Sequence, residues 1–181
     1  MHFSCYVMHR SDRNPQETVS NLIEPYRETD NSGHWDWFQI GGRWTGALDG
    51  YDPEKDPSNH KPCDLCNGTG KRQNPPNIGA GNYPCNGCES TGTMFVWPTS
   101  FKPHEGDTQP ISIVYAGMKF KTQKGSVIYL PCAFVDLQGE WHESPRKETV
   151  RNKRNWKDKV LAAFEKVTER PVFVTVVDCH T

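Results

Sequence analysis

Apolar and polar positions alternate along the first part of the chain in a way that predicts a strand and then a helix. Residues 2–9 alternate loosely and are rich in strand-forming side chains, so they predict a first strand. Asn14 followed by Pro15 is typical of a helix start, and apolar residues then recur at helical spacing. Pro25 limits this helix to about ten residues.

An aromatic stretch at residues 34–46 follows, with three tryptophans, a phenylalanine and an isoleucine close together. The Gly41-Gly42 pair interrupts it. Glycine adopts backbone angles that an aromatic residue cannot, so the stretch predicts a strand that runs into a tight turn or bulge.

The second half of the chain predicts several short strands. Residues 93–97 are apolar and end at Pro98, and residues 111–115, 126–135 and 140–143 also have strand-like patterns. A turn around Gln138-Gly139 joins the last two of these.

A helix and a final strand complete the pattern. Ser144-Pro145 is expected to open a long helix. Its apolar side would carry Trp156, Val160, Ala163, Phe164 and Val167. Pro171 ends the helix, and the almost continuously apolar residues 172–178 predict a buried strand.

These elements indicate an α+β fold. Without residues 49–97 their order approaches β-α-β-β-α-β, which is the ferredoxin-like frame. We therefore expect a core domain made of residues 1–48 and 98–181, with residues 49–97 inserted as a zinc ribbon and its linkers.

Four cysteines dominate the inserted segment. Cys63 and Cys66 form one C-x-x-C pair, Cys85 and Cys88 form a second, and 18 residues lie between the inner cysteines. Two such pairs at this separation are typical of a zinc site, and four thiolates leave no position for water. The sequence therefore predicts one structural zinc ion. His60 is an alternative ligand.

The first pair reads C-x-x-C-x-G-x-G, and the second differs only at Ser90. The segment 63–92 thereby resembles the cysteine-rich zinc repeat of DnaJ-type co-chaperones. Those proteins carry four repeats, and this chain has two and lacks a His-Pro-Asp tripeptide. The resemblance implies a borrowed module without co-chaperone activity.

The wider chain resembles small uncharacterised proteins of phages and their bacterial hosts. The resemblance is carried by Trp35-Asp36-Trp37 and Ile40-Gly41-Gly42-Arg43-Trp44 before the cysteines and by Trp97-Pro98-Thr99 after them. It implies an origin in a phage or its bacterial host and supplies no activity.

Composition narrows the setting. The 181 residues are 34% hydrophobic and contain 29 Gly and Pro, so much of the chain must be loop. Three cysteines remain beyond the four, and this odd number argues against a disulfide framework. The sequence shows neither a signal peptide nor an apolar run of membrane-spanning length. We expect a cytoplasmic protein, in the host cytoplasm if the gene is phage-encoded.

His34, Asp36 and Arg43 are candidate ligand-binding residues in the aromatic stretch. Flat aromatic surfaces beside a guanidinium suit a base, a nucleotide or an anionic group. The alternative is that the aromatic side chains belong to the core and that the glycines serve packing.

The segment 146–170 is basic, since it contains nine Lys/Arg and only four Asp/Glu. Such a cluster can bind phosphates, and it is equally typical of a solvated helix face. The candidates for contact with a polyanion or a partner are Arg146, Lys147, Arg151, Lys153, Arg154 and Lys157.

Asp136, Glu140, His142 and Glu143 are close enough in sequence to form an acid/base or metal cluster, or else an ordinary charged hairpin face. No motif of a known enzyme class is visible. The sequence thus favours a non-enzymatic, zinc-stabilised binding protein. Its partner would be a protein, such as a host protein or defence complex, with nucleic acid as an option through the basic helix. The alternative is a small enzyme or nucleotide-binding protein that uses the aromatic stretch.

Overall fold

The chain forms two compact units. One comprises Met1–Tyr51 and Lys102–Thr181 and is called the core unit here; the other comprises Asp52–Phe101 and is called the cysteine unit. The structure is a computed structural model, and it describes residues 1–11, 13–29, 33–72, 83–97, 101–119, 128–147, 149–167 and 171–181.

The core unit contains both helices and strands, as an α+β fold requires. In chain order its elements are β1 (His2–His9), α1 (Pro15–Ile23), β2 (Trp37–Ile40), β7 (Thr108–Pro110), α2 (Ile111–Lys119), β8 (Ala133–Val135), β9 (Trp141–Glu143), α3 (Val150–Glu165) and β10 (Phe173–His180). The Asn14 side chain accepts a hydrogen bond from the N–H of Glu17 and so begins α1 as the sequence predicts.

A single mixed sheet runs through the core unit in the order β2-β10-β1-β8-β9. The last strand of the chain, β10, lies inside the sheet and pairs with three other strands. It pairs antiparallel with β1 along its whole length on one side, and with β2 and then β7 on the other. β1 pairs in parallel with β8, and β8 pairs antiparallel with β9. The first and last strands of the chain therefore hold the sheet together.

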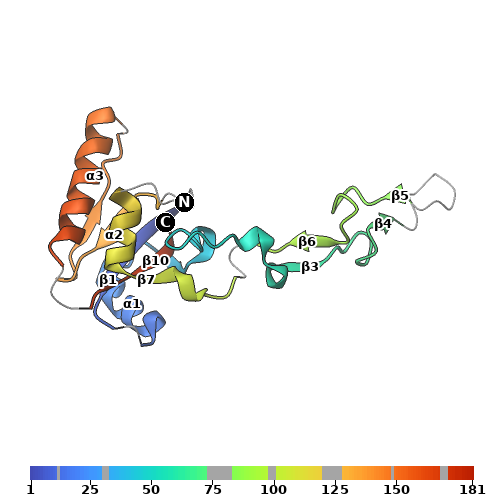
Figure 1. The fold of residues 1–181 in the computed structure, drawn as a ribbon, viewed down its shortest axis with the longest axis horizontal. Coiled ribbons are helices and arrows are strands. Elements are labelled where there is room, and N and C mark those ends of the chain that lie inside the picture. Colours follow the sequence, from blue (N-terminus) through green and yellow to red (C-terminus); the bar gives the residue numbers. More distant parts are fainter. Residues whose placement is uncertain are drawn as a thin grey trace. The chain divides into compact units, whose positions relative to one another are not determined.

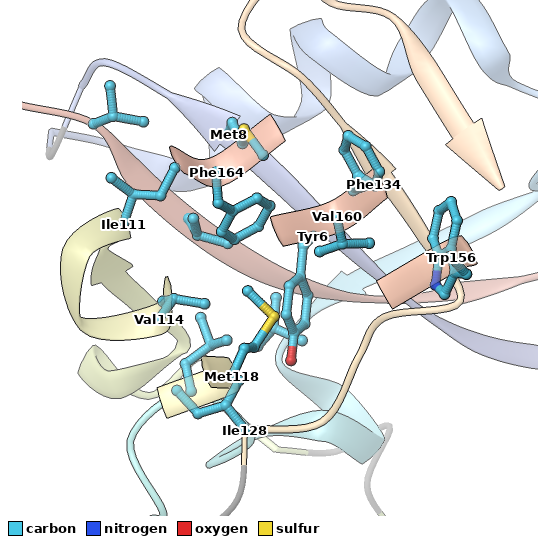
Figure 2. Packing of buried hydrophobic residues seen from close by; sticks show 14 residues of the cluster. Tyr6, Met8, Ile111, Val114, Met118, Ile128, Phe134, Trp156, Val160 and Phe164 are labelled. Carbon is cyan, nitrogen blue, oxygen red and sulfur yellow. The ribbon is translucent and has the colours of Figure 1, made fainter. Parts of the chain in front are cut away.

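Helices cover both faces of this sheet (Figure 1). On one face α2 and α3 bury Val114, Val160 and Phe164 against Tyr6 of β1 and Phe134 of β8. Figure 2 shows this cluster, with side chains from the sheet and from both helices in contact.

The opposite face packs against α1. Val19 and Ile23 of the helix meet Val7, Ala133 and Val177 of the sheet. Because neighbouring residues of β1 and β10 point to opposite faces, each of these strands supplies apolar side chains to both cores. This explains why residues 172–178 read as a continuous apolar run.

The ferredoxin-like frame is not confirmed. That frame is a split β-α-β arrangement, in which another strand lies between the two parallel strands. Here the parallel strands β1 and β8 are direct neighbours, and β8 continues through a hairpin into β9 at the edge of the sheet.

Three elements differ from the expectation. Residues 111–115, predicted as a strand, form the first half of helix α2, because Ile111, Val114 and Met118 recur at helical spacing and are the positions that become buried. The strand predicted at 126–135 is limited to β8 among the described residues. Helix α3 begins at Val150, after an N-cap at Thr149, and not at Ser144-Pro145.

The Gly41-Gly42 turn lies between two buried carboxylates. Both glycines have positive φ angles, of 69° and 54°. A Cβ at Gly41 would lie 2.1 Å from Oδ2 of Asp107, and a Cβ at Gly42 would lie 2.6 Å from Cβ of Asp178. The glycines of the aromatic stretch therefore meet both a conformational and a packing requirement.

No helix in the described part of the chain has the length and apolar character needed to cross a membrane.

Candidate metal centre

Four buried cysteines gather at one point of the cysteine unit. The ligand atoms of Cys63, Cys66, Cys85 and Cys88 all lie within 4.8 Å of one another. The Sγ atoms of Cys63 and Cys85 are 3.8 Å apart, and those of Cys66 and Cys88 are 3.7 Å apart.

The first C-x-x-C pair owes its geometry to a tight turn. The N–H of Gly68 donates to the carbonyl of Cys63 at 3.2 Å, and the N–H of Gly70 donates to the sulfur of Cys66 at 3.3 Å. The Thr69 hydroxyl donates to the carbonyl of Cys66. The turn thus brings two sulfurs to one side and directs a backbone N–H group at one of them.

The second pair repeats these contacts 22 residues later. The N–H of Ser90 donates to the carbonyl of Cys85 at 2.9 Å, and the N–H of Gly92 donates to the sulfur of Cys88 at 3.3 Å. Thr91 bonds the carbonyl of Cys88 as Thr69 bonds that of Cys66.

The two turns also bind each other reciprocally. The N–H of Cys63 donates to the carbonyl of Gly92 at 2.8 Å, and the N–H of Cys85 donates to the carbonyl of Gly70 at 2.9 Å. The strands beside the two turns pair in the same way. β3 (His60–Pro62) pairs antiparallel with β6 (Thr93–Phe95), and β4 (Lys71–Arg72) pairs antiparallel with β5 (Tyr83–Pro84). The cysteine unit is therefore built as two equivalent halves.

Gly70 and Gly92 permit the close approach of the halves. A Cβ at Gly70 would lie 2.4 Å from the carbonyl oxygen of Ser90, and a Cβ at Gly92 would lie 2.4 Å from that of Gly68. Both glycines also have positive φ angles. Any other residue at either position would push the two turns apart.

The sulfur geometry fits a tetrahedral metal ion. Four sulfurs at about 2.3 Å from one zinc ion stand about 3.8 Å apart, and the two direct sulfur–sulfur distances match this spacing. A four-sulfur set favours zinc among the common divalent ions, and it is closed to water.

Backbone groups also affect the acidity of the thiols. Burial raises the pKa of Cys63 to about 11. Burial likewise opposes ionisation of Cys85, but N–H groups of Gly87 and Cys88 outweigh it and lower the pKa of Cys85 to about 7. Because a metal binds the thiolate, binding to this cluster releases protons.

Searches of family models, of curated proteins and of solved structures found no match to the chain. The resemblance to DnaJ-type repeats therefore stays at the level of the cysteine motif, and the resemblance to phage proteins gains no support.

The structure places the candidate residues of the aromatic stretch in two separate clusters. His34 bonds Glu143 through Nδ1 at 2.7 Å and stacks on Trp141. Asp36 instead bonds His180 at 2.8 Å. The backbone N–H of Arg43 donates to Asp178.

Asp36 and Arg43 are linked indirectly, through two histidines and a buried aspartate. Asp178 is fully buried and bonds His2 at 2.8 Å, and the rings of His2 and His180 are 4.9 Å apart. The structure thus connects Asp36 with the backbone of Arg43 but leaves His34 outside. Sequence reasoning missed His2 and His180, which lie near opposite ends of the chain and meet only because β1 pairs with β10.

The basic candidates are all exposed. Arg146 and Lys147 precede α3; Arg151, Lys153, Arg154 and Lys157 lie on it. Exposure agrees with both a binding surface and a solvated helix face, so contact with a polyanion stays a prediction.

The hairpin cluster is only partly assembled. Asp136, Glu140 and His142 bring their ligand atoms within 4.8 Å of one another, whereas Glu143 bonds His34. His60, the alternative cysteine-site ligand, bonds the carbonyl of Glu54 at 2.8 Å and lies outside the four-cysteine group.

Proposed function

We propose that the four cysteines hold one structural zinc ion and that the chain is a non-enzymatic binding protein with a protein partner. The observation that carries this proposal is the closed four-sulfur cluster. Because all four ligand positions would be thiolates, the ion has no open position for a substrate or water. Its contribution is then the folding of the cysteine unit.

Exposed apolar side chains on the cysteine unit support the binding role. Leu65 is 53% exposed and Tyr83 is 40% exposed. Leu65 lies over Gly87, since a Cβ at Gly87 would come within 2.5 Å of its Cδ1. Because Gly87 has no side chain, Leu65 can pack over it and stay at the surface, where it is available to a partner.

Affinity purification with the zinc-loaded protein tests the binding role. We expect Leu65→Ser and Tyr83→Ser together to remove a partner protein that the wild-type chain retains, while zinc content stays at one ion per chain. Ile113→Ser is the matched control, because Ile113 is an apolar residue of the core unit with 51% exposure.

Two results contradict the proposal. One is a wild-type chain that retains no protein under these conditions. The other is a partner lost equally with Ile113→Ser, since binding would then not depend on the cysteine unit.

A further inference from the structure

A cavity of about 630 Å³ lies in the core unit, beside the β8–β9 hairpin and α3. Its volume is within the range of about 300–1,000 Å³ found for small-molecule sites. Leu137, Ala163 and Val167, which are partly exposed, give it an apolar floor, whereas Met8 and Phe134 border it from the packed core and are each 1% exposed. Figure 2 shows Met8 and Phe134 where they join the packed cluster of α3. The floor suits a ring or another apolar group.

Three cationic side chains line the same cavity. Arg10 follows β1, Lys159 lies on α3, and Lys166 is the C-cap of α3, about two helical turns beyond Lys159. Within the residues that the structure describes, none of the three forms a salt bridge. The charge of Lys166 also interacts favourably with the helix dipole at the C-terminus of α3, but this interaction does not explain the placement of Arg10 or Lys159. Three like charges around one cavity attract an anion.

The polar wall of the cavity is an oriented carboxylate–histidine pair. Oδ2 of Asp136 and Nε2 of His142 are 2.9 Å apart, and the His142 ring packs on Phe134 with ring centres 4.5 Å apart. Oδ1 of Asp136 accepts from the N–H groups of Gln138 and Glu140, both at 2.9 Å. Among described residues, Nδ1 of His142 has no hydrogen-bond partner, so it is available to a ligand.

These contacts keep Asp136 ionised. Partial burial works against its charge, but the hydrogen bonds from His142 and from the two backbone N–H groups outweigh burial and lower the pKa of Asp136. A carboxylate with three donors has little capacity left for a further ligand. The role of Asp136 is then to fix the orientation of the His142 ring.

We propose that this cavity binds a small phosphate ester whose organic part is a ring or another apolar group. The phosphate contacts Arg10, Lys159 and Lys166, the organic part rests on Leu137, Ala163 and Val167, and Nδ1 of His142 forms a hydrogen bond with the ligand. This site is independent of the zinc site and goes beyond the proposed function.

A divalent cation is the competing occupant, because the ligand atoms of Asp136, Glu140 and His142 lie within 4.8 Å of one another. Two observations favour the anion. Asp136 already accepts three hydrogen bonds. The three cations that line the cavity would also repel a metal ion.

The test uses the full-length, zinc-loaded, ¹⁵N-labelled protein. Phenyl phosphate and AMP are titrated in separate experiments, with phenol and adenosine as their uncharged counterparts. We expect saturable amide shifts around Asp136–His142 and the end of α3 with the two phosphate esters, and none with phenol or adenosine.

Charge variants then locate the phosphate. We expect Lys159→Gln with Lys166→Gln to weaken binding of phenyl phosphate at least about tenfold, since two charge-assisted contacts are lost. Arg154→Gln with Lys157→Gln is the matched control. This pair removes two positive charges from exposed positions on α3 that do not line the cavity, and it should change the dissociation constant less than about twofold.

Three outcomes overturn the proposal. In the first, neither phosphate ester gives saturable shifts at the cavity. In the second, Arg154→Gln with Lys157→Gln weakens binding as much as Lys159→Gln with Lys166→Gln, which indicates general attraction to a basic helix. In the third, Mn²⁺ broadens the amides of residues 136–142 while the phosphate esters leave them unchanged, which assigns the cluster to a cation.

Discussion

Ser90 occupies a backbone conformation that usually belongs to glycine. Its φ angle is 70°, and the residue at the equivalent place in the first turn is Gly68, with a φ angle of 79°. A non-glycine residue in the left-handed region is strained by about 1–2 kcal/mol, and glycine removes this strain. Glycine also makes the unfolded chain more flexible, which offsets about 0.4–1 kcal/mol of the gain. Ser90 is therefore a weak point in the second turn.

We expect Ser90→Gly to stabilise the folded cysteine unit by about 0.5–1 kcal/mol. Since metal binding and folding are coupled, zinc affinity measured against a competing chelator should rise about two- to fivefold. Gly68→Ser is the mirror control. A Cβ there would meet Pro62 only at 3.5 Å, so the change adds backbone strain without a clash and should lower the affinity. An unchanged affinity in both variants would contradict this account of the turn.

Helix α2 shows where local patterns mislead. The segment is rich in strand-forming residues, namely Ile111, Ile113, Val114 and Tyr115, and for this reason the sequence predicts a strand. The buried positions nevertheless recur at helical spacing. Ile113 is 51% exposed, whereas Val114 is fully buried. The alternation that a strand in this sheet would need is absent, and packing against α3 decides the outcome.

Strands β1 and β10 and helix α1 were predictable because each carries its own signal. The Asn14-Pro15 start and the apolar run of 172–178 are local features. The order of strands in the sheet was not predictable, since it depends on pairings between distant segments such as β1 with β8.

The start of α3 offers a test at the level of one element. The Thr149 hydroxyl accepts a hydrogen bond from the N–H of Asn152 at 3.1 Å, which satisfies one of the free donors of the first turn. We expect Thr149→Ala to lower the free energy of unfolding of the core unit by about 1 kcal/mol in urea titrations. Thr149→Ser keeps the acceptor and should remain near the wild-type value. Equal losses in the two variants would show that Thr149 acts through packing of its methyl group.

At the scale of the whole molecule, each of the two units has buried clusters of its own. The core unit buries two clusters against its sheet, and the four cysteines with Met94 form another in the cysteine unit. Cysteine spacing was sufficient to predict that the four thiols gather at one point, because each C-x-x-C pair folds into a tight turn. The cavity beside α3 was not predictable, since Arg10, Asp136 and Lys166 meet only in the folded sheet.

Removal of the metal should therefore affect the units differently. We expect a strong chelator to abolish ordered amide signals from the cysteine unit, because its core consists mainly of metal ligands. Signals of the β1–β10 pair should persist, and Cys63→Ser should give the same result without chelator. Loss of the core signals together with the cysteine unit would show that the two units fold as one.

The exchange of identical hydrogen bonds between the two halves of the cysteine unit has a consequence for its ancestry. Each half contributes two sulfurs to the cluster, and it gives its counterpart one N–H donor, one carbonyl acceptor and two strands. A shorter ancestral chain with only one half could have made the same contacts by forming a homodimer around one shared metal ion. Duplication would then have turned a metal-dependent association between chains into a fixed feature of one chain.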